Sequence, residues 1–168
     1  MKIQLFVFLW CSILLSNSIF GQAEVMNTSF GKMLDTLLSH AVQEIVPEQL
    51  KDKSAIIYLD AREKSEYNVS HIKDAIWVGY TGFKKKRIDD VDKNAEVVVY
   101  CSVGYRSEKI AERLKKLGFK NVSNLYGGIF EWAHHNNEVY NENGVTDSIH
   151  AYDKNWGQWL ETGNKVYK

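Results

Sequence analysis

The chain has 168 residues and carries 21 basic and 21 acidic side chains, so its formal net charge at pH 7 is zero. This length suits one domain with one hydrophobic core. The charge balance gives no electrostatic basis for binding nucleic acid. The basic cluster at 84–87 is followed at once by Asp89, Asp90 and Asp92. We interpret it as a solvated loop, with a basic docking patch as the alternative.

Residues 1–21 have the pattern of a secretory signal peptide: a positive start, an apolar run through Leu15, then small residues up to Gly21. We predict cleavage after Gly21, with cleavage after Ser18 as the alternative. The run is short for a membrane span and has polar interruptions, so removal is favoured over a retained anchor. The mature protein is therefore expected to be exported, periplasmic or secreted, and not to span a membrane.

Apolar residues with helical spacing predict a helix in an N-terminal extension, 22–45, capped at Ser29 and ended by Pro47. After this proline, short apolar runs typical of strands alternate with segments typical of helices. The predicted strands are 55–59, 75–78, 96–100 and 121–125. The predicted helical segments are 48–50, 63–67, part of 80–92, 107–118 and 129–134. This alternation indicates βαβ units and an α/β fold, with a central parallel sheet covered by helices on both faces.

The segment 137–168 is polar but rich in aromatic residues, which distinguishes it from a disordered tail. We predict a C-terminal extension that packs on the domain, rather than a surface for a partner. Its aromatic residues are Tyr140, Tyr152, Trp156, Trp159 and Tyr167.

Cys101 follows the apolar run 97–100, at the carboxyl end of a predicted parallel strand, where ligands bind in such sheets. Backbone amides and the positive end of the following helix favour a thiolate at this position. Loss of the signal peptide removes Cys11, so Cys101 has no disulfide partner in the mature chain. We therefore predict a reactive thiol rather than a buried inert one.

The loop from Cys101 to Arg106 can form an anion-binding arc. Its amides can point inward as a nest, and Gly104 permits a backbone angle that other residues resist. Arg106 adds a cationic fork for an oxyanion. Protein tyrosine phosphatases place one more residue between the cysteine and the arginine, whereas four intervene here. The tighter arc suits sulfur better than a tetrahedral phosphate.

Three segments, in order and with matching spacing, resemble the signatures of the rhodanese family. They are Leu59 to Glu63 with Glu66-Tyr67 and His71 to Ile76, then Val98 to Ser107, then Leu117 to Val122 with Leu125 to Trp132. They define an expected rhodanese domain at 46–136. Ser70 and Lys73-Asp74 depart from the family's pattern, at a turn that we interpret as structural.

The resemblance implies a single rhodanese domain with a central five-stranded parallel sheet. It implies a sulfurtransferase that works through a persulfide on Cys101, by ping-pong covalent catalysis, with no metal or organic cofactor. The donor would be thiosulfate or a similar compound, and the acceptor a thiol, cyanide or a protein. At this length we expect no tandem second domain, and we expect the donor to bind to this domain or to a partner.

The predicted site surrounds the thiol. Arg106 is expected to bind the anionic donor, with a salt bridge at the pocket rim as the alternative. The other residues assigned to substrate binding are Arg62, Ser102, Val103, Gly104, Tyr105 and Ser107. Asp60 and His71 are interpreted as structural groups near the site, and Ser107 also as a helix cap. No metal site is expected, because the histidines lack ligand companions at suitable spacing.

Two other functions remain open. One is a cysteine phosphatase or arsenate reductase on the same scaffold, which phosphatase activity without sulfur transfer would reveal. The other is a persulfide carrier or regulatory binding module, which would accept sulfur but turn over poorly without its partner.

Overall fold

The computed structural model describes residues 23–50 and 52–168. The predicted signal peptide and its cleavage site lie outside these residues. Within the described part of the chain, no helix is long and apolar enough to cross a membrane.

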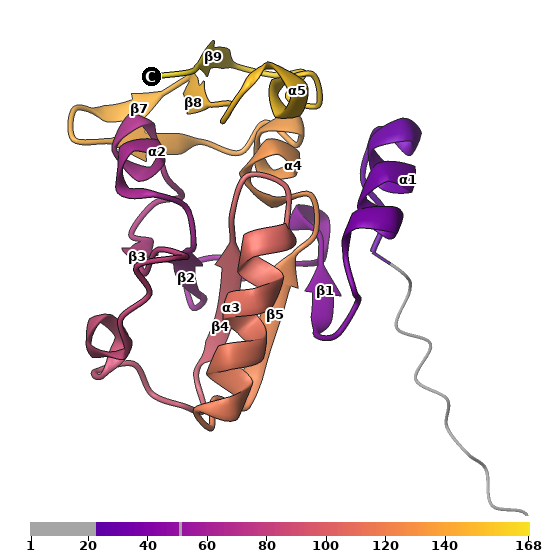
Figure 1. Ribbon diagram of the computed structural model, residues 1–168. Helices are drawn as coiled ribbons and strands as arrows, with labels where there is room; N and C mark the ends of the chain where they lie inside the picture. Colours follow the sequence, from indigo (N-terminus) through magenta and orange to yellow (C-terminus); the bar gives the residue numbers. More distant parts are fainter. Residues whose placement is uncertain (1–22, 51) are drawn as a thin grey trace, which may run out of the picture.

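A five-stranded parallel sheet forms the centre of the molecule, in the order β1-β5-β4-β2-β3 (Figure 1). The strands are β1 (Gln43–Ile45), β2 (Ile57–Asp60), β3 (Ile76–Trp77), β4 (Glu96–Tyr100) and β5 (Asn121–Leu125). The predicted α/β class is confirmed. Because β4 lies in the middle of a parallel sheet, its carboxyl end opens at a natural ligand-binding edge.

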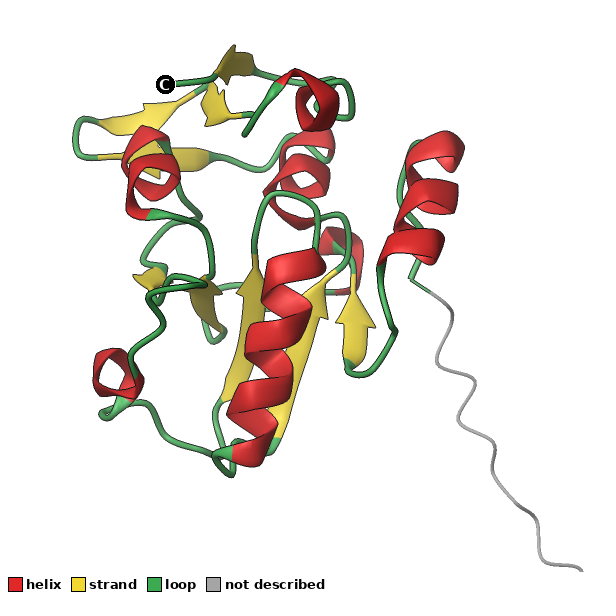
Figure 2. Ribbon diagram, in the orientation of Figure 1, coloured by secondary structure: helices red, strands yellow, loops and turns green. Residues whose placement is uncertain are grey.

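Helices cover both faces of this sheet (Figure 2). They are α1 (Thr28–Leu37), α2 (Lys64–Val69), α3 (Tyr105–Lys116) and α4 (Gly128–His134), with 3₁₀ turns η1 (Pro47–Gln49) and η2 (Lys85–Ile88). Side chains of β4 alternate between two apolar clusters. Val97 and Val99 pack with α3, whereas Val98 and Tyr100 pack with α1 and α4. Both faces of β4 are thus buried, as its uninterrupted apolar run indicates.

The N-terminal helix is shorter than its apolar spacing predicts. It ends at Leu37, and its cap is Asn27 instead of Ser29, since Asn27 Oδ1 accepts from the amides of Ser29 (2.8 Å) and Phe30 (2.9 Å). The prediction of helix across 38–45 is wrong, because the chain leaves the helix after Leu37 and residues 43–45 pair with β5 as β1. Pairing at the sheet edge outweighs local helical preference.

The C-terminal segment 137–168 lies beyond the carboxyl ends of the central strands (Figure 1). It contains a hairpin of β6 (Val139–Asn141) and β7 (Gly144–Thr146), then β8 (Ser148–His150), α5 (Lys154–Gly157) and β9 (Asn164–Val166), with β8 and β9 paired in parallel. Ile149, Ala151 and Leu160 are buried in the core.

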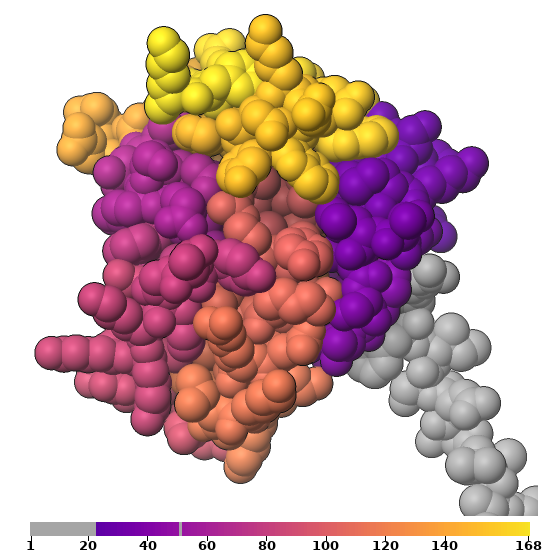
Figure 3. All heavy atoms as spheres, in the orientation of Figure 1, coloured from indigo at the N-terminus to yellow at the C-terminus, as the bar shows by residue number. Residues whose placement is uncertain are grey.

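The N-terminal and C-terminal segments lie side by side at this end (Figure 3). Trp159 stacks on Phe30 of α1, with ring centroids 5.6 Å apart. Asn27 Nδ2 donates to Glu161 Oε1 (2.5 Å). The two segments therefore meet on the side of the sheet where Cys101 emerges.

Candidate active site

Cys101 is the first residue after β4, and its side chain is buried. The Gly104 amide donates to Cys101 Sγ (3.1 Å), so the loop turns back over the sulfur as the predicted arc requires. Gly104 has φ +120° and precedes α3. A residue with a side chain would be strained at this angle, which explains the glycine.

Helix α3 begins at Tyr105, two residues earlier than predicted, so Ser107 is not its cap. Ser107 Oγ lies 2.9 Å from the Gly104 carbonyl oxygen and 2.7 Å from Asn124 Oδ1. Asn124 Nδ2 also donates to the Gly104 carbonyl (3.1 Å). These buried groups fasten the loop to β5. The sequence prediction missed Asn124, because nothing in its local pattern marks it.

Helix α4 supports the loop from the other side. The amides of Ile129 and Phe130, in its first turn, donate to the carbonyls of Cys101 (2.9 Å) and Ser102 (3.2 Å). Gly128 has φ +60°, and a Cβ there would lie 2.4 Å from the Cys101 carbonyl oxygen. Glycine is therefore required for the close approach of the two backbones.

Arg106 forms a largely buried bidentate ion pair with Glu66 of α2. Its Nη1 and Nη2 donate to Glu66 Oε2 and Oε1, each at 2.7 Å, and Nη2 also donates to Ser102 Oγ (3.0 Å). Burial lowers the pKa of Arg106, but Glu66 and the charge of Cys101 raise it above the usual value on balance. Burial raises the pKa of Glu66, but the contact with Arg106, together with the Glu63 amide and the charge of Arg62, outweighs it, so that pKa is lowered. Both groups are therefore charged at neutral pH.

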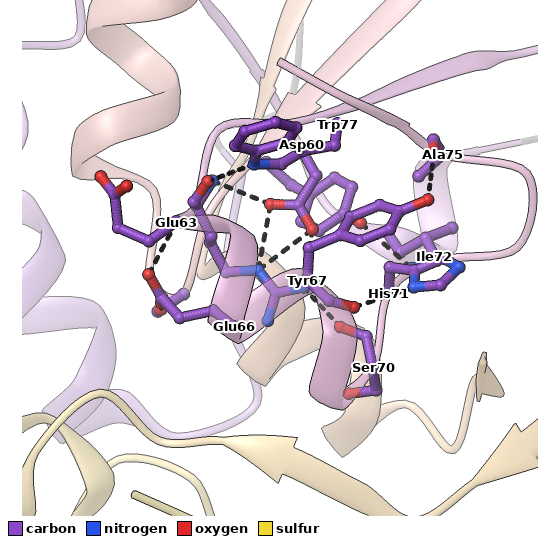
Figure 4. Close-up of polar contacts among 12 residues, drawn as sticks. Asp60, Glu63, Glu66, Tyr67, Ser70, His71, Ile72, Ala75 and Trp77 are labelled. Carbon is purple, nitrogen blue, oxygen red and sulfur yellow. Dashed lines mark hydrogen bonds and ion pairs between the residues drawn. The ribbon is translucent and has the colours of Figure 1, made fainter. Parts of the chain in front are cut away.

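The structure does not bring Arg62 to the thiol. Its side chain is fully buried, and its Nε (3.0 Å) and Nη2 (2.6 Å) donate to the carboxylate of Asp60 (Figure 4). Nη2 also donates to the Ser70 carbonyl (2.6 Å). The pair joins the end of β2 to the end of α2, which is the structural role predicted for Asp60.

His71 is likewise held by structural contacts. Its ring stacks on Tyr67, with centroids 3.9 Å apart, and Nδ1 lies 3.0 Å from the Tyr67 carbonyl oxygen (Figure 4). Its backbone exchanges two hydrogen bonds of 2.8 Å with Tyr140 of β6. His71 thus connects the central domain to the C-terminal segment.

A pocket of about 410 Å³ opens over Cys101. Five predicted site residues line it: Cys101, Ser102, Val103, Tyr105 and Arg106. The residues that the sequence did not indicate are Leu37, Glu63, Tyr80, Thr81, Tyr152 and Trp156. Gly104 and Ser107 shape the loop from behind, and Arg62 lies elsewhere. The pocket therefore combines a nucleophile loop from the central domain with walls from both extensions.

A thiol at the end of a central parallel strand, enclosed by a short loop and an arginine, defines an α/β domain built for nucleophilic cysteine chemistry. Residues 43–135 match the family of the Rhodanese-like domain. The chain belongs to this family, as its three signatures predict.

Relatives of known description agree with this assignment. A tRNA uridine(34) hydroxylase of Hamiltonella defensa is 39% identical over 93 residues, which are 52% of this chain and 26% of that protein. A putative sulfur carrier protein of Bacillus subtilis is 34% identical over 97 residues, which are 55% of this chain and 52% of that protein. The chain spans about half, or less, of the length of these relatives.

Solved structures share the fold. A rhodanese-related protein of Thermoplasma volcanium superposes with a TM-score of 0.52 and 26% identity, covering 60% of this chain and 99% of that one. A thiosulfate sulfurtransferase of Pseudomonas aeruginosa gives a TM-score of 0.55 at 20% identity, over 79% of this chain and 26% of that one. The second likeness concerns the fold alone.

Proposed function

We propose that the protein is an exported sulfurtransferase that passes a sulfane sulfur from thiosulfate or a similar donor to a thiophilic acceptor. The observation that carries the proposal is the placement of Cys101 Sγ at the base of an accessible pocket, under the Gly104 amide and beside Arg106. Export rests on the signal-peptide pattern of residues 1–21.

The first step is attack of the Cys101 thiolate on the outer sulfur of thiosulfate. A bond forms between Sγ and that sulfur, and the bond to the sulfonate sulfur breaks, so sulfite leaves with the electron pair. The second step is attack of cyanide or a thiolate on the terminal persulfide sulfur, which releases thiocyanate or a new persulfide and restores the thiolate. Two nucleophilic displacements of this kind give ping-pong kinetics.

The loop supplies what the persulfide needs. The Gly104 amide is a donor for the anionic sulfur, and Arg106, which donates to Ser102 Oγ, adds positive charge beside the loop. No proton has to move in either displacement, since the attacking and leaving groups are both anions. This agrees with the placement of His71 in structural contacts instead of at the thiol.

The test is intact mass spectrometry of the full chain, expressed in a bacterial host and exposed to thiosulfate. We expect the protein to gain one sulfur atom, to lose it to cyanide as thiocyanate, and to begin at Gln22. The matched variant Cys101→Ser should gain none.

Full thiocyanate production by Cys101→Ser would contradict the mechanism. A protein that loads one sulfur but releases it only to a particular protein acceptor would be a carrier, the description given to its Bacillus subtilis relative. Hydrolysis of an aryl phosphate with no sulfur gain would favour the phosphatase alternative. A mass that includes residues 1–21 would contradict cleavage.

A further inference from the structure

One side of the pocket is built by residues outside the family match at 43–135. Leu37 comes from the end of α1, and Tyr152 and Trp156 come from the C-terminal segment. In the space-filling view, the C-terminal segment covers the end of the molecule beside the N-terminal segment (Figure 3). The family core thus supplies the nucleophile, and the extensions supply an apolar wall.

The pocket is poorly matched to a small dianion. Among its lining residues, all within the described chain, Arg106 is the single cation, and both arms of its guanidinium are already bonded to Glu66. The Tyr152 ring lies over the same guanidinium, 5.2 Å from its central carbon. Glu63 adds a negative group at the wall. A bare inorganic donor would therefore gain little electrostatic attraction.

The size of the pocket also favours a donor larger than a small inorganic anion. Its volume of about 410 Å³ lies in the range of sites that enclose organic ligands. An anion of a few atoms would leave most of this space to water. A donor with a carbon substituent would instead cover the apolar faces of Leu37, Tyr152 and Trp156.

Tyr152 is held in place by its backbone. It has φ +66°, which is uncommon for a bulky residue, and its amide donates to Nδ1 of the buried His150 (3.0 Å). The residue is nevertheless 49% exposed, so burial does not explain the strain. Strain that the surrounding structure maintains is a feature of ligand-binding positions.

We infer that the two extensions select an organic sulfur donor, whose apolar or aromatic substituent packs on Tyr152 and Trp156. This inference rests on the proposed function and names its substrate class, an organic thiosulfonate or persulfide anion. With a thiosulfonate, the Cys101 thiolate bonds to the outer sulfur. The bond from that sulfur to the sulfonyl group breaks, and the organic sulfinate leaves with the electron pair. With a persulfide, a thiolate leaves in the same way.

The test compares two donors that differ only in their substituent, the benzenethiosulfonate and methanethiosulfonate anions. The measured quantity is the ratio of their kcat/KM values, with cyanide as acceptor. A change in this ratio between variants is independent of the intrinsic reactivity of each donor. We expect Tyr152→Asn and Trp156→Ala each to lower it by about tenfold, the effect of losing one aromatic contact.

Two further variants control for other causes. Tyr152→Phe keeps the ring and should keep the wild-type ratio. Tyr140→Asn makes the same exchange as Tyr152→Asn on β6, away from the pocket lining, and should leave the ratio and the activity unchanged. Asparagine tolerates the left-handed backbone at 152, so Tyr152→Asn is expected to fold.

An unchanged ratio in both Tyr152→Asn and Trp156→Ala, with Cys101 still loaded by both donors, would overturn the inference and leave the proposed function standing. Failure of all donors to load Cys101 in the wild-type protein would instead overturn the proposed function, and the inference with it.

Discussion

Glu66 is the residue that ties the thiol loop to α2, because its carboxylate accepts both arms of Arg106. In Glu66→Gln the guanidinium would stay mostly buried without a counter-charge, since the Arg106 side chain is only 15% exposed. We expect the free energy of unfolding to fall by about 3 kcal/mol at pH 7. Urea denaturation measures this. Glu112→Gln, which breaks the more exposed pair with Lys109, should cost at most about 0.5 kcal/mol.

The same ion pair predicts how the stability of the fold changes at low pH. The pKa of Glu66 is lower in the folded protein than its ordinary value of 4.5. Its contribution to stability is therefore complete above pH 4.5 and is lost as the pH falls through the folded pKa. Glu66→Gln should flatten this acid decline. An equally steep decline in the variant would show that Glu66 is not its source.

The sequence could identify the nucleophile and its arginine, but not how the charges pair. Two carboxylates, Asp60 and Glu66, and two arginines, Arg62 and Arg106, all belong to the family signatures. Asp60 pairs with its near neighbour Arg62, whereas Glu66 pairs with a residue from another element. The second pairing depends on where the fold places α2 relative to α3, which local sequence does not contain.

At the scale of elements, the contact between α4 and the Cys101 loop depends on Gly128. In Gly128→Ala the new Cβ would collide with the backbone of Cys101 and Ser102, so the loop or the helix must move. We expect a loss of about 3 kcal/mol in the free energy of unfolding, together with slower sulfur loading. The control is Gly144→Ala, which has φ +109° and nothing within 4 Å of the new Cβ. It should cost only about 1 kcal/mol and leave loading unchanged.

Equal losses in the two alanine variants would mean that backbone strain alone, and not the contact with the loop, explains the glycine. The comparison is sharp because both glycines have a positive φ, and only Gly128 approaches another backbone.

Elements with long apolar runs were predictable, and short edge elements were not. The strands 96–100 and 121–125 have the predicted bounds. In contrast, β1 has only three residues, too few to show a strand period, and its partner β5 is distant in the sequence. Its single apolar residue, Ile45, also fits the helical period of the preceding segment. Only the pairing with β5 settles which structure forms.

At the scale of the whole molecule, the pocket is lined both by residues of the family domain and by residues of the two extensions. The signatures predicted the loop and the parallel sheet, but they end before Tyr152 and Trp156 and start after Leu37. The aromatic composition of 137–168 indicated packing on the domain. It could not indicate that two of those aromatics would face the thiol pocket, because their position depends on the path of the segment across the sheet edge.

His150 couples the C-terminal segment to the charges of the site, and this gives a pH prediction for the whole protein. Burial lowers its pKa below the ordinary value of 6.5 and outweighs the opposing effect of the Glu66 charge, and the charges of Arg62 and Arg106 lower the pKa further. Below pH 6.5 the unfolded chain therefore binds a proton that the folded chain resists. It follows that the free energy of unfolding should fall as the pH drops through 6.5. Denaturation in urea between pH 7.5 and 5.5 measures this decline. His150→Gln should flatten this decline, since glutamine keeps an acceptor for the Tyr152 amide but does not titrate.

His40 provides a control of opposite sign. Its hydrogen bond to Glu44 raises its pKa in the folded state, so its contribution to the free energy of unfolding grows on acidification. His40→Gln should make the decline steeper, and a decline that survives unchanged in His150→Gln would rule out His150 as its origin.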